Sequence, residues 1–287
     1  MAMIPRSMGS MRITALPLIR PVSGAWPTRK LPIFYGYKII APPPIKKTST
    51  PRGGFARWLP EDGLGKWASH KANQTWTGFG LAPAGTVKQR AFQLGERLMD
   101  QLDFEESNLK ALDLSSAPPP KLNGQSVETA TDAQVPLVYP PSVLSGPQSL
   151  DHLKALVEER IPLHNRGLAT WIFFAILSAP LKLIPIIPNF PFYFCAWRSW
   201  SHWKARRSAQ YIQGLIQSNR IVPIALPPLD CVYDADLSDT KSGVVPREEL
   251  ELAARILTLE PEETKELLRA HEQVLSRVLE KSEKKTL

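Results

Sequence analysis

The sequence predicts a mainly α-helical, membrane-associated protein with a proline-broken hydrophobic helical hairpin and flanking amphipathic helices. Lys182 is the only charged residue between Gly167 and Trp197. No Asp or Glu occurs from Ile161 to Leu229. The apolar stretch is interrupted by Pro180, Pro185, Pro188 and Pro191. A long uncharged stretch inside an acid-free window is typical of a segment that leaves water for lipid. A hairpin buried in a soluble helical domain is the alternative interpretation.

The prolines divide the hairpin into two arms. Proline lacks a backbone donor and disfavours the α conformation of the preceding residue, so the first arm should end between Pro180 and Ile184. Counted from Gly167, this arm would be about 27 Å long at roughly 1.5 Å per residue, near the thickness of a hydrocarbon core. Asn189 and Pro191 suit the start of a second helix, as a polar cap followed by a first-turn proline.

Basic and aromatic residues follow the second arm. Tryptophan prefers the headgroup level of a membrane, and lysine and arginine at segment ends set orientation. We therefore expect both ends of the hairpin at one negatively charged leaflet. The predicted interfacial anchors are Trp197, Trp200 and Trp203. The residues predicted to bind anionic lipid headgroups, cardiolipin among them, are Arg198, Lys204, Arg206 and Arg207.

Two polar residues lie near the proline turn of the hairpin, Lys182 and Asn189. The long stem of Lys182 lets its ammonium group reach the far interface, which is the conservative interpretation. Alternatively, Lys182 and Asn189 line an ion or lipid pathway near the proline turn, where free backbone carbonyls can coordinate cations. A cation pathway usually includes a carboxylate, and this hairpin has none.

Composition divides the whole chain into six regions. The first has many Lys and Arg and no acidic residue, which is typical of a mitochondrial targeting region, with a disordered basic tail as the alternative. The regions are a basic targeting-like segment (1–60), a soluble helical region (61–114), a disordered linker (115–134), the membrane-hairpin core (135–229), a loop (230–246) and a C-terminal helical pair (247–287).

Apolar spacing predicts helices on both sides of the hairpin. In the soluble region the residues that recur at helical spacing are Val87, Ala91, Leu94, Leu98 and Leu102. Residues 135–142 are predicted to be extended, and Ser149 is the predicted N-cap of the helix that leads into the hairpin. We expect the C-terminal pair to bind other protein subunits.

Signatures of catalysis are missing. There is no GxxxxGK[ST], GxGxxG, HExxH, GxSxG or paired CxxC. Glu158, Glu159 and His164 fit a solvated helix face better than an acid–base set. The histidines are scattered without ligand spacing, at His70, His152, His164, His202 and His271. We predict that the protein is not an enzyme and has neither a cofactor nor a metal site.

The segment RSWSHWKARR, which ends at Arg207, could also bind nucleic acid, with arginine on phosphate and tryptophan stacked on bases. Because it continues directly from the uncharged stretch, we expect no nucleic-acid partner. Cys195 and Cys231 are predicted to be reduced and structural.

Five segments of the chain form recognisable motifs, namely MRITALPL (11–18), FYGYKIIAPPPIKKTS (34–49), WASHKANQTWTGFG (67–80), VYPPS (138–142) and LSAPLKLIPIIPNFPFYFCAWRSWSHWKA (177–205). These motifs resemble those of the fungal mitochondrial potassium/proton exchange-related proteins. The resemblance implies a protein of the mitochondrial inner membrane, with both hairpin ends on the matrix side, that takes part in exchange of matrix potassium for protons. We expect a subunit or regulator of the exchanger. A membrane-anchored scaffold or assembly factor with no transport role is the alternative.

Overall fold

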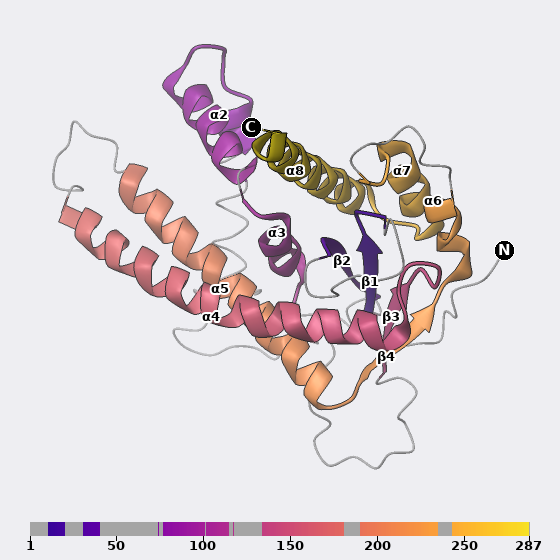
Figure 1. Cartoon of the computed structure of the whole chain (residues 1–287). Helices are drawn as coiled ribbons and strands as arrows, with labels where there is room; N and C mark the ends of the chain where they lie inside the picture. Colours follow the sequence, from indigo (N-terminus) through magenta and orange to yellow (C-terminus); the bar gives the residue numbers. More distant parts are fainter. Residues whose placement is uncertain are drawn as a thin grey trace, which may run out of the picture. The chain divides into compact units, whose positions relative to one another are not determined.

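The computed structural model describes residues 11–20, 31–40, 74, 77–100, 102–114, 117, 134–180, 190–234 and 243–286. The chain forms two compact units, one of Met1–Pro42 with Asp103–Leu287 and the other of Pro43–Leu102. In the smaller unit, α2 (Val87–Asp100) spans the stretch whose apolar spacing predicts a helix. The other labelled elements belong to the larger unit (Figure 1).

A four-stranded mixed sheet forms the middle of the larger unit. Its strands are β1 (Met11–Pro17), β2 (Ile33–Ile39), β3 (Val135–Tyr139) and β4 (Ile221–Ala225), in the order β2-β1-β3-β4. β1 pairs with β2 in antiparallel and with β3 in parallel orientation, and β3 and β4 are parallel. Ile13 lies opposite Leu137 in this register.

The predicted mainly α fold class is therefore wrong, and the fold is mixed α/β. β1 lies inside the segment predicted to be targeting-like, and β4 lies at the end of the acid-free window. Every residue of β1 is buried, because each side of the strand faces a core, so β1 has no exposed face of the kind that identifies a half-exposed strand. Its parallel partner β3 lies far along the chain, so no hairpin turn marks the pairing either.

Helices cover both faces of the sheet (Figure 1). On one face lie α4 (Gly146–Ser178) and α5 (Phe190–Gln217), which together connect the parallel neighbours β3 and β4. On the other face lie α7 (Arg247–Ile256) and α8 (Pro261–Thr286). The short η5 (Pro227–Leu229) and α6 (Cys231–Asp234) follow β4.

Each face has its own apolar core. The core beneath the α4–α5 hairpin includes Ile13, Leu137, Leu153, Ala209 and Ile212. The core beneath α7 and α8 includes Leu16, Phe34, Val138, Leu250 and Leu267. Side chains of β1 enter both cores alternately, because successive residues of a strand point to opposite faces. The apolar stripes of the C-terminal helices are thus largely used inside the fold.

Capping and proline chemistry set the limits of the hairpin helices. Ser145 begins α4 with a capping box, in which its hydroxyl accepts from the Gln148 backbone and its own backbone donates to the Gln148 side chain. Ser149, the predicted cap, lies inside the helix and donates to the Gly146 carbonyl at 2.8 Å. α4 continues through Pro162 and ends at Ser178. Lys182 and Asn189, the predicted pathway residues, lie outside the described residues.

No helix in the described part of the chain combines the length and the apolarity needed to cross a bilayer. The prediction of a hairpin embedded in the membrane core is corrected accordingly. The uncharged stretch begins at Gly167 and α4 ends at Ser178, so only the C-terminal part of this helix is free of charge. Its N-terminal part packs Leu153 and Val157 against the sheet.

Candidate functional site

A group of polar side chains lies buried where the hairpin meets α3 (Phe104–Ala111). α3 contributes a carboxylate, α4 an imidazole, and α5 an arginine, a hydroxyl and a second imidazole. We call these residues the root cluster: Glu106, His164, Arg198, Ser201 and His202. All are buried except Arg198, which is partly buried. Polar groups at such depth are stable only with defined partners, so their arrangement is specific.

Arg198 and Ser201 hold the Glu106 carboxylate from α5. Arg198 donates through Nη1 to Oε1 and through Nη2 to Oε2, the latter at 3.1 Å. The Ser201 hydroxyl donates to Oε1 at 2.7 Å. Burial alone would raise the pKa of Glu106, but these hydrogen bonds and the arginine charge lower it to about 2. Glu106 is therefore a carboxylate at physiological pH.

Two imidazoles meet beside this ion pair. Nδ1 of His164 lies 3.1 Å from Nδ1 of His202, and their ring centroids are 5.4 Å apart. Burial lowers the pKa of His164 to about 4, opposed by the Glu106 carboxylate and helped by His202 and the nearby arginines. Burial also lowers the pKa of His202. Both rings are neutral near pH 7, with lone pairs available to accept a proton, a hydrogen bond or a metal ion.

The low pKa of His164 predicts that the protein loses stability in acid. In the unfolded chain His164 takes up a proton near pH 6.5, whereas in the fold it does so only near pH 4. The free energy of unfolding should therefore fall as pH drops from 6.5 toward 4, by at most about 3 kcal/mol from this residue. The charged groups that face His164 are Glu106 on α3, Arg160 on α4, and His202 and Arg198 on α5.

Urea titrations at several pH values test this expectation. In a His164→Gln variant the dependence between pH 6.5 and 4 should be shallower than in the wild type. An equal slope in both proteins would contradict the assignment of the acid lability to His164.

Gly167 lets the His202 ring approach α4. A Cβ atom at this position would lie 2.6 Å from Cε1 of His202, closer than nonbonded carbons come. We expect Gly167→Ala to lower the free energy of unfolding by about 1–3 kcal/mol, the usual effect of overpacking. This loss should exceed the roughly 1 kcal/mol that alanine contributes through helix propensity.

A double-mutant cycle isolates this contact. In a His202→Ala background the ring is absent, so Gly167→Ala should be neutral or stabilising in chemical unfolding. A similar loss in both backgrounds would mean that the ring does not occupy the space above Gly167.

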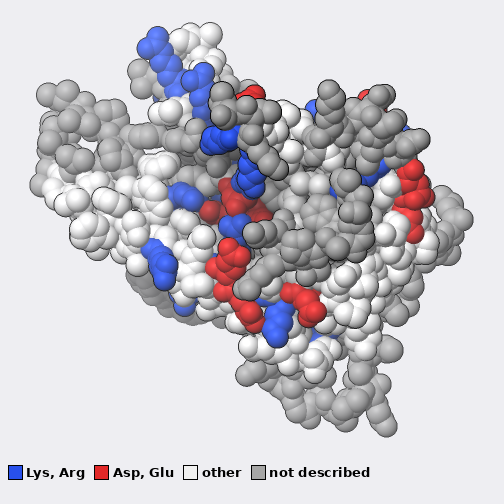
Figure 2. All heavy atoms as spheres, viewed as in Figure 1, with Lys and Arg blue, Asp and Glu red and all other residues white. Residues whose placement is uncertain are grey.

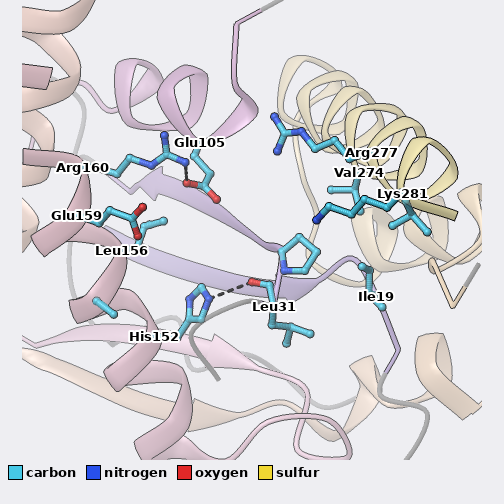
Figure 3. Close-up of a pocket in the computed structure, with 13 residues that line it drawn as sticks. Ile19, Leu31, Glu105, His152, Leu156, Glu159, Arg160, Val274, Arg277 and Lys281 are labelled. Atoms are coloured by element: carbon cyan, nitrogen blue, oxygen red, sulfur yellow. Dashed lines mark hydrogen bonds and ion pairs between the residues drawn. The ribbon is translucent and has the colours of Figure 1, made fainter. Parts of the chain in front are cut away.

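A pocket of about 290 Å³ lies next to the root cluster, between α4, α8 and the ends of β1 and β2 (Figure 3). Its polar wall includes Arg160, which forms ion pairs with Glu105 and Asp103. Burial raises the pKa of Glu105 although Arg160 opposes this. His152 also lines the pocket and has a partner on each nitrogen, the Tyr35 hydroxyl at 2.9 Å and the Leu31 carbonyl at 3.0 Å.

The structure places the predicted membrane-contact residues of α5 in two groups. Arg198 is paired with Glu106, and Trp197 lies under Lys110, whose Nζ is 5.3 Å from the ring centroid. In the second group Trp200, Trp203 and Arg207 are exposed and Lys204 and Arg206 are partly buried. Lys204 lies over Trp200 at 5.5 Å and Arg207 over Trp203 at 5.4 Å. Arg206 has a buried Nε. Headgroup binding by these residues stays a prediction.

Glu106 and the pairing of the two histidines are absent from the sequence-based site. The sequence contains one indication of this site. Arg198, Ser201 and His202 have i, i+3, i+4 spacing and therefore share one helix face. His164 and Gly167 are likewise three residues apart. This spacing does not indicate Glu106 on α3, because α3 is separated from the hairpin by a long stretch of chain.

Comparison with known proteins identifies the chain. A family described as mitochondrial K+–H+ exchange-related matches residues 12–216, which include the root cluster. The chain belongs to this family. The resemblance inferred from the sequence motifs is thus confirmed, and the family description links the chain to the mitochondrion and to potassium–proton exchange.

Two fungal proteins, both named as uncharacterized, are similar to this member of the exchange-related family. One, from Saccharomyces cerevisiae, is 22% identical over 171 residues, 54% of this chain and 53% of that protein. The other, from Schizosaccharomyces pombe, is 29% identical over 160 residues, 55% of this chain and 58% of that protein. The matched region spans little more than half the length of each relative. No solved structure matches the chain.

Proposed function

We propose that the chain takes part in mitochondrial potassium/proton exchange as a subunit or regulator of the exchanger, attached to the matrix side of the inner membrane. The observation that carries this proposal is the family match over residues 12–216. That range contains α4 and all but the last residue of α5. The base of this hairpin is packed on the sheet, and its distal part extends beyond the sheet (Figure 1). We therefore expect the hairpin to be the element that contacts the membrane.

The part of α4 and α5 that extends beyond the sheet, which we call the distal hairpin, carries exposed apolar side chains that support a membrane contact. Phe173, Ile176 and Leu177 on α4 are 62%, 69% and 64% exposed, and Tyr193 on α5 is 62% exposed. In Figure 2 the described part of the distal hairpin, on the left, is mostly white. Neighbouring apolar side chains this exposed mark an interaction surface more often than a free one.

Charge favours an anionic bilayer surface as the occupant. No acidic residue occurs from Ile161 to Leu229, so the distal hairpin and the residues next to it in this range carry no negative charge that would repel anionic lipid. Trp200 and Trp203 are half-exposed and each lies beneath a cation, Lys204 and Arg207. Tryptophan with adjacent basic residues is typical of contact with headgroups, of which cardiolipin is the most anionic candidate here. In this proposal the exposed apolar side chains of α4 and α5 enter the interface, and the hairpin does not cross the bilayer.

Two assays test the proposal on one triple variant, Phe173→Ser with Ile176→Ser and Leu177→Ser. Flotation with cardiolipin-containing vesicles measures membrane binding, and potassium-acetate swelling of mitochondria that contain only the variant measures exchange. Since each buried apolar side chain contributes about 1.5–3 kcal/mol, vesicle binding should weaken at least about tenfold. Swelling should slow at equal protein level.

A matched control has the same chemistry elsewhere, Leu252→Ser with Leu279→Ser on α7 and α8, where both leucines are exposed. This control should bind vesicles and support swelling as the wild type does. Normal flotation of the triple variant would contradict the membrane contact. Lost flotation with normal swelling would contradict the exchange role and favour the scaffold alternative, in which the exposed leucines of α7 and α8 hold partner proteins.

A further inference from the structure

Glu106, His164 and His202 bring potential metal ligands from three different helices to one point. One donor atom from each residue lies within 4.8 Å of the other two. All three residues are buried, and His164 has no exposed surface. The sequence separation between Glu106 and the histidines is large, so this convergence is a product of the fold.

The histidine pair has the spacing that a tetrahedral ion requires. With metal–nitrogen bonds of about 2.0–2.1 Å, two imidazole nitrogens on one zinc ion lie about 3.3 Å apart. The two Nδ1 atoms are 3.1 Å apart. A carboxylate oxygen of Glu106 lies within 4.8 Å of the histidine donor atoms.

His164 differs from the other buried histidine of α4. His152 has a hydrogen-bond partner on both nitrogens, Tyr35 and the Leu31 carbonyl. Nε2 of His164 is buried with no partner among the described residues, and its Nδ1 faces another imidazole nitrogen. Two neutral rings in such contact can share only one hydrogen bond. A cation between them would use both Nδ1 lone pairs at once.

The surroundings support these ligands as metal sites usually do. Ligating carboxylates are commonly oriented by further hydrogen bonds, and Arg198 and Ser201 do this for Glu106. Oε1 is used by both residues, whereas Oε2 accepts from Arg198 alone at 3.1 Å and keeps a lone pair. Gly167 sets the position of the His202 ring, because any larger residue would displace it.

We propose that Glu106, His164 and His202 bind one divalent transition-metal ion, with zinc as the best fit, and that this ion ties α3, α4 and α5 together at the base of the hairpin. Two imidazoles and one carboxylate suit zinc and its neighbours, whereas magnesium and calcium prefer oxygen ligands alone. The site is independent of the proposed exchange function. It differs from the expectation, drawn from spacing along the chain, that the histidines lack a ligand arrangement.

Metal binding can be measured directly on the full chain without an affinity tag. The protein is freed of metal with a chelator and titrated with Co2+, whose visible absorption reports tetrahedral nitrogen and oxygen ligation, and then with Zn2+ as competitor. We expect one equivalent of each ion and a higher melting temperature with Zn2+. A wild-type protein that retains no equivalent of either ion would overturn the proposal.

Substitutions identify the ligands. His164→Gln and His202→Gln should each weaken Co2+ binding by more than about a hundredfold, and Ser201→Ala by about 10–100-fold through the carboxylate. His152→Gln, a buried histidine on the same helix as His164, is the control and should bind as the wild type does. If both ligand variants bind Co2+ like this control, the site is wrong. If a variant does not fold, the wild-type spectrum and stoichiometry still decide.

Discussion

Replacing Arg198 with methionine should lower the free energy of unfolding by about 3–5 kcal/mol, the usual cost of removing one partner of a buried ion pair. The Glu106 side chain is only 5% exposed and would keep Ser201 as its remaining donor within the root cluster. Its charge would then be buried without a counterion. Urea unfolding at pH 7 measures this loss.

A companion variant separates the ion pair from the packing of the arginine stem. Removing both charges, with Glu106→Leu added to Arg198→Met, should restore most of the lost stability because no buried charge remains. If the double variant is as unstable as the single one, the loss comes from packing and the ion pair is not its cause. If Arg198→Met is nearly neutral, Arg198 does not carry the pairing that the structure assigns to it.

Leu267→Asp should abolish stable folding of the larger unit, with an expected loss of about 4 kcal/mol or more. Leu267 is fully buried on α8, in the core shared with Leu16, Phe34 and Val138 of the sheet. A carboxylate at this position would have no counterion among these apolar neighbours. The expected readout is loss of the cooperative thermal transition and of the near-ultraviolet circular dichroism signal.

Leu279→Asp is the matched control on the same helix. Leu279 is 49% exposed, so the new carboxylate would stay in water and the change in stability should be within about 0.5 kcal/mol. The pair also tests whether the C-terminal helices are part of the fold or a separate interaction unit. If Leu267→Asp leaves the rest of the larger unit folded, α8 is not needed for the second face of the sheet.

Local features of the chain predicted much of the helical structure. The apolar spacing from Val87 predicts α2, and the hairpin residues do form two long helices joined across the proline-rich stretch. One local detail was wrong, because Ser145 and not Ser149 caps α4.

The strands and the candidate site were harder to predict. β1 is buried on both sides, and its composition is equally typical of a targeting region. Arg198 was predicted to bind lipid headgroups because it follows an apolar stretch. In the structure it binds Glu106, a residue of α3 that no spacing rule connects to it.

The sequence by itself determined where most helices form, that the stretch from Gly167 to Trp197 is apolar and free of acids, and to which family the chain belongs. These properties depend on neighbouring residues, so they can be recognised without the fold. Only the tertiary structure decided that the hairpin connects two parallel strands, and that Glu106, His164 and His202 meet at its base. The reason is that strand pairing and side-chain clustering join residues distant in sequence, and their positions are set by packing on the shared sheet.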